Sequence, residues 1–115
     1  MQEDITELIR LNEEITTLEN AGDLTRLGKK LASKLAFQRR DGSIVNREEF
    51  LTTPRLGGRE LQIASVAVYA NRAVVIGVVT DGEVVTHNIR LFVKEVDQET
   101  NSKQWKLLGW ANEPV

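Results

Sequence analysis

The N-terminal part of the chain alternates apolar and polar side chains with a period of three to four residues. The apolar positions are Ile5, Leu8, Leu11, Ile15 and Leu18. This period predicts an amphipathic α-helix that buries one stripe of its surface. Gly22 closes the helix, because glycine readily adopts the left-handed conformation at a helix end. Asp23 is typical of the cap of a second helix, with an apolar stripe at Leu24, Leu27 and Leu31, so the two helices are predicted to form a hairpin.

Beyond Leu35 the apolar positions alternate or form β-branched runs, which predicts strands. Asp41-Gly42 and Asp81-Gly82 are tight-turn signals between such runs. Asn46, with Glu49 three positions later, is typical of a helix cap and predicts a short third helix. Long strands are predicted over residues 61–70, 72–80, 83–96 and 104–112. The predicted fold class is α+β, with an N-terminal helical hairpin and a short third helix packed on an antiparallel sheet.

The strand over residues 83–96 has one face that is clearly more apolar than the other. The more apolar face carries Val85, His87, Ile89, Leu91 and Val93. We expect this face to lie under the helices, because burial of apolar area stabilises the fold by about 25 cal/mol per Å². The opposite face, with Arg90 and Lys94 among its members, is expected to be partly solvated.

The strand over residues 72–80 is apolar on both faces, with Val75 and Gly77 on one and Val74 and Ile76 on the other. Helices that pack on one side of a sheet leave the other side in water. We therefore expect a second copy of the chain to cover that side, which gives a homodimer through the sheet. The alternative is that long side chains of neighbouring strands shield it.

The composition restricts the function. The 115 residues suffice for a single domain, here residues 1–115, and 17 acidic against 15 basic side chains give a net charge of −2. That balance argues against nucleic acid as a partner. The chain has no cysteine and one histidine, His87, which excludes disulfides, thiolate chemistry and sites that need two imidazoles. We expect no cofactor and no metal.

The chain also lacks a segment that would place it in a membrane. Its N-terminus is acidic, unlike a signal peptide. The longest apolar stretch, residues 73–79, is far shorter than the roughly 20 residues that cross a bilayer. We expect a cytoplasmic protein.

The order of the predicted elements resembles the nuclear-transport-factor-2-like (NTF2-like) superfamily. Three stretches support the resemblance, at residues 37–51, 68–75 and 105–110, which ends in Trp105-Lys106-Leu107-Leu108-Gly109-Trp110. Within the superfamily, the chain is most similar to the small bacterial domains grouped with ketosteroid isomerase and SnoaL-type polyketide cyclases. The resemblance implies a curved, cystatin-like sheet that forms a cone around a pocket, and dimerisation through that sheet. Members include enzymes, ligand carriers and association modules, so the fold does not settle the function.

The acid and base groups of the resembled enzymes are not recognisable here. Ketosteroid isomerase uses a carboxylate base with a tyrosine and a protonated aspartic acid as donors. The only tyrosine, Tyr69, lies on a predicted strand, and no pair of carboxylates is predicted inside the cone. His87 is the candidate acid or base, and its alternative role is that of a buried structural imidazole. Whether the protein is an enzyme stays open.

The first functional hypothesis is that the cone binds a small, largely apolar molecule. The candidate ligand-binding residues are Phe37, Arg39, Ile89, Trp110 and Asn112. The second hypothesis is a SnoaL-like or ketosteroid-isomerase-like enzyme (isomerase, cyclase or dehydratase) with His87 in the pocket. The third is a dimerising association module without a ligand.

Overall fold

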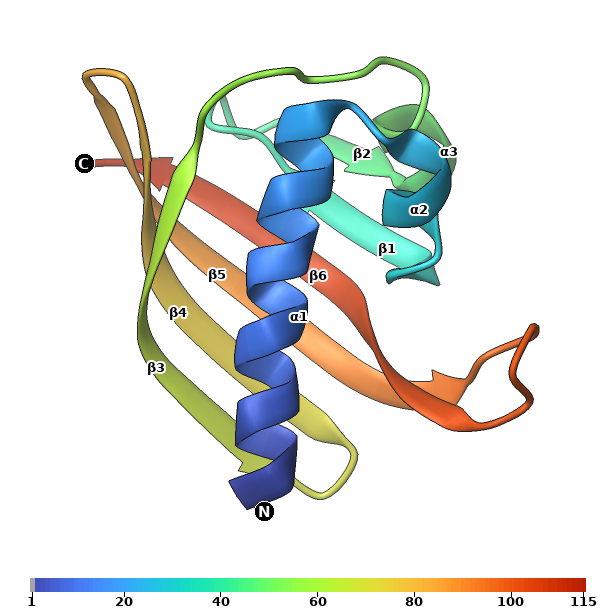
Figure 1. Ribbon diagram of the computed structural model, residues 1–115. Coiled ribbons are helices and arrows are strands. Elements are labelled where there is room, and N and C mark those ends of the chain that lie inside the picture. The colour runs from blue at the N-terminus through green and yellow to red at the C-terminus, as the bar shows by residue number, and fades with distance from the viewer. Residues whose placement is uncertain (1) are drawn as a thin grey trace.

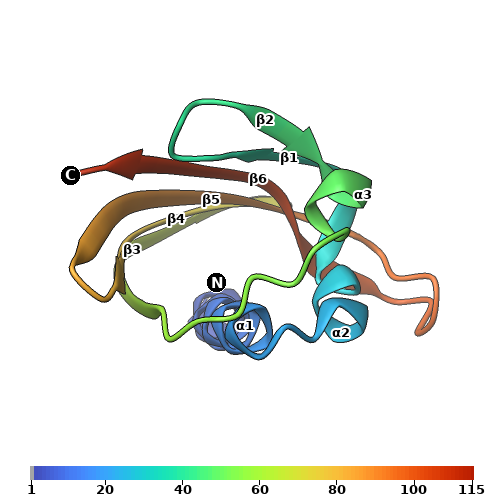
Figure 2. The ribbon, with the colours of Figure 1, turned by 90° about the horizontal axis from the view of Figure 1, so that it is seen from above.

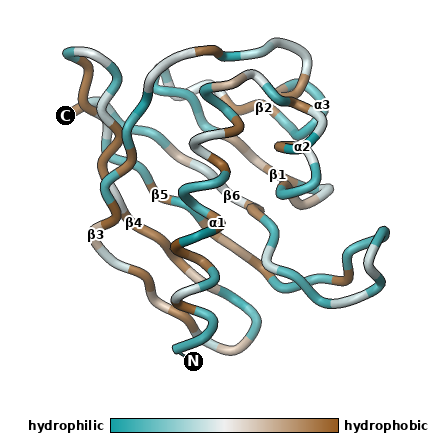
Figure 3. Tube along the Cα trace, viewed as in Figure 1, coloured by the Kyte–Doolittle hydropathy of each residue, from teal (hydrophilic) through white to brown (hydrophobic). Residues whose placement is uncertain are grey.

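The computed structural model describes residues 2–115, and its longest helix follows the predicted stripe. Helix α1 spans Gln2–Ala21 and buries Leu8, Ile15 and Leu18. Glu3 and Asp4 lie in its first turn, where negative charge interacts favourably with the helix dipole. In Figure 3, hydrophobic and hydrophilic positions alternate from turn to turn along this helix. No helix within residues 2–115 is both long enough and apolar enough to cross a membrane.

The second helix is shorter than the sequence pattern predicts. Helix α2 spans only Leu24–Gly28, with the Asp23 side chain as its cap. Leu31, which was assigned to this helix, instead begins strand β1 (Leu31–Gln38) and lies opposite Leu107 of β6. The backbone of Lys30 already accepts a hydrogen bond from Leu107 at 2.9 Å. Pairing with a distant strand therefore ends the helix, which a local pattern does not reveal.

The sheet has six strands in the order β2-β1-β6-β5-β4-β3. The strands other than β1 are β2 (Ile44–Asn46), β3 (Glu60–Tyr69), β4 (Arg72–Asp81), β5 (Val84–Val96) and β6 (Lys103–Pro114). Neighbouring strands are antiparallel except β1 and β6, which are parallel. The predicted α+β class is confirmed, and the single parallel pairing makes the sheet mixed.

The short third helix is confirmed with its cap. Helix α3 spans Arg47–Phe50, and Asn46 and Glu49 form a reciprocal capping box. The Asn46 side chain accepts from the Glu49 backbone and the Glu49 side chain accepts from the Asn46 backbone, each at 2.9 Å. Both predicted Asp-Gly turns also form, since Gly42 and Gly82 have φ of 90° and 64°.

The sheet curves around α1 and leaves its convex side open. Figure 1 shows α1 lying across the concave side of the sheet, with α2 and α3 beside the β1–β2 hairpin. Figure 2, turned by 90°, shows α1 end-on inside the curve. The core between helix and sheet includes Leu8, Leu27, Phe92, Trp105 and Leu107. The helices hold the sheet in the cone-like shape that the resemblance implies.

The predicted inside face of β5 is wrong. The buried residues are Thr86, Asn88, Arg90 and Phe92, whereas His87, Ile89 and Leu91 point to the convex side and are exposed. The reason is that α1 offers polar partners to the concave face. Asn12, Thr16 and Glu19 are all buried on the helix stripe that faces the sheet. A polar strand face can be buried when the opposing element satisfies its hydrogen bonds.

Candidate functional site

A cavity of about 490 Å³ lies between the C-terminal half of α1, the β1–β2 hairpin, the loop after α3 and strands β4–β6. Its lining is strongly charged. The charged lining residues are Glu19, Arg39, Arg40, Asp41, Arg55, Arg59, Asp81 and Arg90. Five arginines against three acids give the lining a formal charge of +2, although the whole chain carries −2. The cavity is thus a positive region on an acidic protein.

Arg90 forms the floor of the cavity and joins the sheet to α1. Its side chain is only 1% exposed. One terminal nitrogen donates to the Asn12 side-chain oxygen at 3.1 Å and to the Asn12 carbonyl at 3.3 Å, and the other donates to Thr16 Oγ1 at 3.4 Å. Desolvation lowers the pKa of Arg90 to about 10, and the charge of Glu19 partly opposes this shift. Arg90 therefore stays positively charged at neutral pH.

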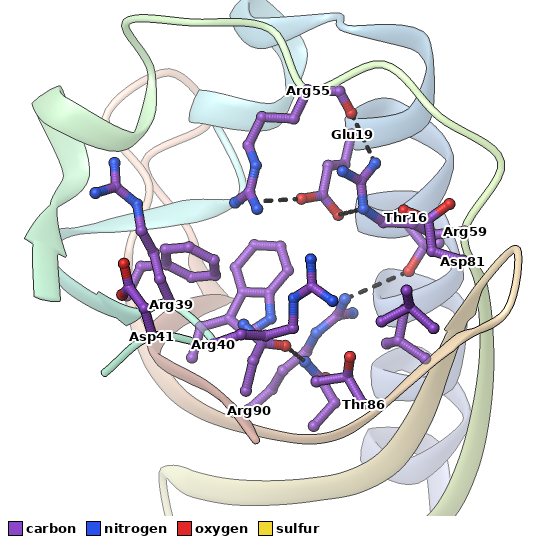
Figure 4. A pocket seen from close by; sticks show the side chains of 16 residues that line it. Thr16, Glu19, Arg39, Arg40, Asp41, Arg55, Arg59, Asp81, Thr86 and Arg90 are labelled. Carbon is purple, nitrogen blue, oxygen red and sulfur yellow. Dashed lines mark hydrogen bonds and ion pairs between the residues drawn. The ribbon is translucent and has the colours of Figure 1, made fainter. Parts of the chain in front are cut away.

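Glu19 is a buried carboxylate in the wall of the cavity, 4% exposed. Arg55 Nη1 lies 3.8 Å from its Oε2 and Arg59 Nε lies 3.9 Å from its Oε1, so both ion pairs are longer than a hydrogen bond. Figure 4 shows the two arginines approaching Glu19 from the loop while Arg90 rises from the sheet. Burial raises the pKa of Glu19, and the charges of Arg59, Arg90 and Arg55 counteract part of that rise.

The loop that supplies Arg55 and Arg59 is fastened to the end of α1. The Asn20 side chain donates to the Arg59 carbonyl at 2.9 Å and accepts from the Arg59 backbone at 3.1 Å. Arg59 Nη1 also donates to the Arg55 carbonyl at 2.7 Å. The Arg55 guanidinium lies 5.0 Å from the centre of the Phe37 ring, within the range of a cation–π contact. These contacts hold both guanidinium groups over the cavity.

Three aromatic rings form the apolar part of the wall. Phe37, Phe50 and Trp110 pack with ring centres 4.9–5.4 Å apart. The Arg90 guanidinium lies 4.6 Å from the Trp110 ring centre. Within residues 2–115, the buried Trp110 Nε1 and Arg90 Nε have no hydrogen-bond partner. Unpaired buried donors are rare in proteins, so their position beside the cavity marks this region as a candidate site.

Two amide side chains join the strands at the back of the cavity. Asn88 Nδ2 donates to Asn112 Oδ1 at 2.7 Å, and Asn112 Nδ2 donates to the Gln38 carbonyl at 3.2 Å. These bonds connect β5, β6 and β1. Asn88 is almost fully buried and is part of the lining, so its amide can recognise a polar group of a ligand.

The structure brings four of the predicted site residues to this cavity. Phe37, Arg39, Trp110 and Asn112 all line it, and their binding role stays a prediction. The placement of His87 and Ile89 inside the cone is wrong, because both lie on the convex face. They instead line a second cavity of about 420 Å³. The physical reason is the reversed face of β5 described above.

Sequence reasoning missed Glu19, Arg55, Arg59 and Arg90. A signal for two of them existed in the chain. Asn12, Thr16 and Glu19 are spaced by four and three residues, so they form a polar stripe along the apolar face of a helix. Thr86, Asn88 and Arg90 alternate along one strand, which is the matching pattern for a polar concave face. Arg55 and Arg59 lie in a loop, and no local pattern predicts which way a loop folds.

The arrangement is suited to binding an anion. Arginine offers a planar set of donors that fits a carboxylate, sulfonate or phosphate group in a bidentate manner. Within residues 2–115, Arg39 and Arg40 form no ion pair with an acidic side chain. No cluster of three or more His, Asp or Glu side chains suited to a metal ion occurs in that part of the chain either.

Comparisons with known proteins address the fold. No protein-family model matches the sequence, and no curated protein is significantly similar to it. Solved structures do match. An NTF2-like protein of unknown function from Silicibacter pomeroyi has a TM-score of 0.78 at 16% identity, over 99% of this chain and 98% of that chain. A domain from Exiguobacterium sibiricum, provisionally assigned as a Ca/calmodulin-dependent kinase II association domain, has a TM-score of 0.81 at 16% identity, over 97% and 93%.

The CaMKII hub of S. rosetta is also similar, with a TM-score of 0.75 at 15% identity over 96% of this chain and 95% of that chain. Identities this low establish the architecture and leave the chemistry open. An NTF2-like protein from Cytophaga hutchinsonii is similar over 100% of this chain and 99% of that chain, with a TM-score of 0.78 at 14% identity. The chain therefore has the cone-shaped α+β fold of the NTF2-like superfamily.

Proposed function

We propose that the protein binds a small organic anion in the cone, with the charged group at the arginines and an apolar part against the aromatic wall. The observation that supports this most directly is the excess of arginines in the lining of the cavity. It revises the expected ligand from largely apolar to anionic. Phe37 and Trp110 still offer an apolar surface, so a ligand with both characters fits best.

The size and the dielectric environment of the cavity agree with this function. A volume of about 490 Å³ lies within the range of roughly 300–1,000 Å³ that is typical of small-molecule sites. Arg90 is shielded from water, so its attraction for an anion is stronger than that of a surface arginine. Arg39 and Arg40 are exposed at the mouth, where they can attract an anion from solution.

The test compares an anion with a neutral molecule of the same shape. Benzenesulfonate and benzenesulfonamide are titrated into the protein by calorimetry at pH 7. We expect benzenesulfonate to bind at least tenfold more tightly, because the arginines discriminate by charge. The double variant R39Q/R40Q should weaken that binding, and R72Q, which removes an exposed arginine outside the cavity, should not. Equal affinity for both probes would rule out an anion site.

The enzyme hypothesis based on His87 has no support from the geometry. The imidazole is exposed on the convex face and is not part of the cavity lining. A general acid or base has to reach the reacting group within hydrogen-bond distance or through one water. We therefore do not propose an acid or base role for His87 in the cone.

A second candidate function, association of two copies, is favoured by the convex face of the sheet. Ile76, Ile89 and Leu91 are 44%, 45% and 45% exposed and lie on adjacent strands, where Ile76 pairs with Ile89. Such neighbouring apolar side chains are typical of a protein interface. The names "association domain" and "hub" of two similar structures are consistent with this. We propose a homodimer through this face.

Covering the remaining exposed part of one such side chain contributes about 1 kcal/mol, which is 45% of the value for full burial. In a symmetric dimer each residue counts twice. The variant I89D should therefore weaken the dimer at least 30-fold, since it loses about 2 kcal/mol before the cost of burying a charge. Native mass spectrometry across a concentration series measures this. I9D is the control, because Ile9 is 38% exposed on α1, which packs on the concave side of the sheet, and it should leave the mass distribution unchanged.

A further inference from the structure

The carboxylate of Glu19 occupies an unusual position for a buried acid. It lies in the wall of the cavity, 4% exposed, between guanidinium groups that face it from two sides. Neither ion pair is shorter than 3.8 Å. In a direct hydrogen bond between arginine and a carboxylate, the guanidinium nitrogen lies about 2.7–2.9 Å from the carboxylate oxygen. Glu19 is thus close enough to neutralise the arginines and too far to be fixed by them.

The loop after α3 and strands β4 and β5 contribute charged groups that act on Glu19. The loop after α3 contributes Arg55 and Arg59, and β5 contributes Arg90 from below. Strand β4 contributes a second acid, Asp81, whose negative charge disfavours ionisation of Glu19. On α1 itself, the nearest lining residue is the uncharged Thr16. Three cations and one anion therefore surround the carboxylate.

We propose that Glu19 sets the charge selectivity of the site, because it is a resident counter-anion that takes up a proton when an anionic ligand binds. The proposal rests on the proposed function, since it needs an anion in the same cavity. A ligand anion at the arginines is a like charge close to Glu19, and a like charge favours the protonated form of a carboxyl group. Protonation removes the repulsion and frees the guanidinium groups for the ligand.

The surroundings of Glu19 favour its protonated form. Burial already raises the pKa of Glu19 in the free protein, and a bound anion would raise it further. Arg90, with a pKa of about 10, keeps its charge at neutral and acidic pH. The lining charge then changes from +2 with ionised Glu19 to +3 with protonated Glu19. The added positive charge is what lets a monoanion bind well.

The sign of the pH dependence follows from proton linkage. Between the pKa of Glu19 in the free protein and its higher value in the complex, binding takes up a proton. Affinity for a permanent anion therefore rises as the pH falls, by up to about tenfold per pH unit in that window. Below the free-protein pKa, Glu19 is protonated in both states and the dependence ends.

The experiment measures protons directly. Benzenesulfonate, which stays anionic across the range, is titrated by calorimetry at pH 6, 7 and 8 in two buffers that differ in ionisation enthalpy. The difference in heat gives the number of protons taken up per ligand. We expect uptake of up to one proton by the wild type and none by E19Q, which mimics the protonated state. E19Q should bind at least tenfold more tightly than the wild type at pH 8 and show a flat pH profile.

Two controls isolate the residue. D81N changes the lining charge by the same amount as E19Q but retains Glu19, so it should still take up a proton. H87Q removes the one histidine of the chain, which lies on the convex face, and should also retain the uptake. Loss of the uptake in H87Q would assign the proton to that residue and overturn the proposal.

The outcomes separate the two proposals. If neither the wild type nor E19Q binds benzenesulfonate, the proposed anion site fails. If the wild type binds it without proton uptake, or if E19Q takes up as many protons as the wild type, the anion site stands and the role of Glu19 is overturned. Circular dichroism checks that E19Q is folded. Were it not, the proton counts of the wild type, D81N and H87Q together would still decide.

Discussion

The contact between Arg90 and α1 leads to the most specific stability prediction. We expect R90M to destabilise the fold, because it removes a buried cation that donates three hydrogen bonds to Asn12 and Thr16. Methionine is unbranched and of similar volume but shorter, so it replaces the stem of the arginine and loses the contact of the guanidinium with the Trp110 ring. The variant thus tests the polar contacts and changes the core volume little.

The magnitude follows from the group that is left behind. Without Arg90, the buried Asn12 side-chain oxygen loses its donor at 3.1 Å. An unsatisfied buried acceptor costs about 1–3 kcal/mol, and a hydrogen bond to a charged group contributes about 1.5–3 kcal/mol. The two values describe the same interaction, so we expect a net loss of about 2–3 kcal/mol. For a domain of 115 residues this lowers the Tm by roughly 8–12 °C.

A double variant checks the cause. In N12L/R90M the buried Asn12 side-chain oxygen is removed together with its donor, so most of the loss should be recovered. Urea denaturation at fixed protein concentration, followed by tryptophan fluorescence and circular dichroism, gives the free energy of unfolding. R72M is the matched control at an exposed position and should change it by less than about 0.5 kcal/mol. If R90M were as stable as R72M, or the double variant no more stable than R90M, the reasoning would be refuted.

Three further predictions concern the fold that holds the site. N46A breaks the capping box of α3 and should cost about 1 kcal/mol in urea denaturation, whereas T53A, outside the cap, should not. G77A places a Cβ 2.7 Å from the Gln62 carbonyl oxygen, so strands β3 and β4 must shift. The free energy of unfolding should fall by about 1–3 kcal/mol, which a lower Tm would show. The Lys106 ammonium holds the pKa of Asp97 below its usual range, so this pair stabilises the fold above about pH 4 and the effect is lost in stronger acid. An acid titration of D97N should accordingly show a weaker loss of stability than the wild type, and an identical curve would contradict this.

The polar surface of the cavity shows where local patterns mislead. On β5 the alternate residues His87, Ile89 and Leu91 are more apolar than Thr86, Asn88 and Arg90, so a rule based on hydrophobicity selects the wrong face. The rule fails because burial depends on what the opposing surface offers. Asn12 and Thr16 satisfy Arg90 from a helix that is more than 70 residues away in the chain. The exposed apolar face is available instead for a second copy.

The elements that depend on near neighbours in the chain are predictable from the amino-acid pattern alone. Three features arise from residues that are close in the chain, so short sequence patterns predict them. They are the apolar stripe of α1, the capping box of Asn46 and Glu49, and the Asp-Gly turns. The length of α2, the buried face of β5 and the ion pairs of Glu19 with Arg55 and Arg59 are instead set by long-range packing. Each of these depends on partners that are distant along the chain, and the free energy of such a contact exists only once both partners are in place.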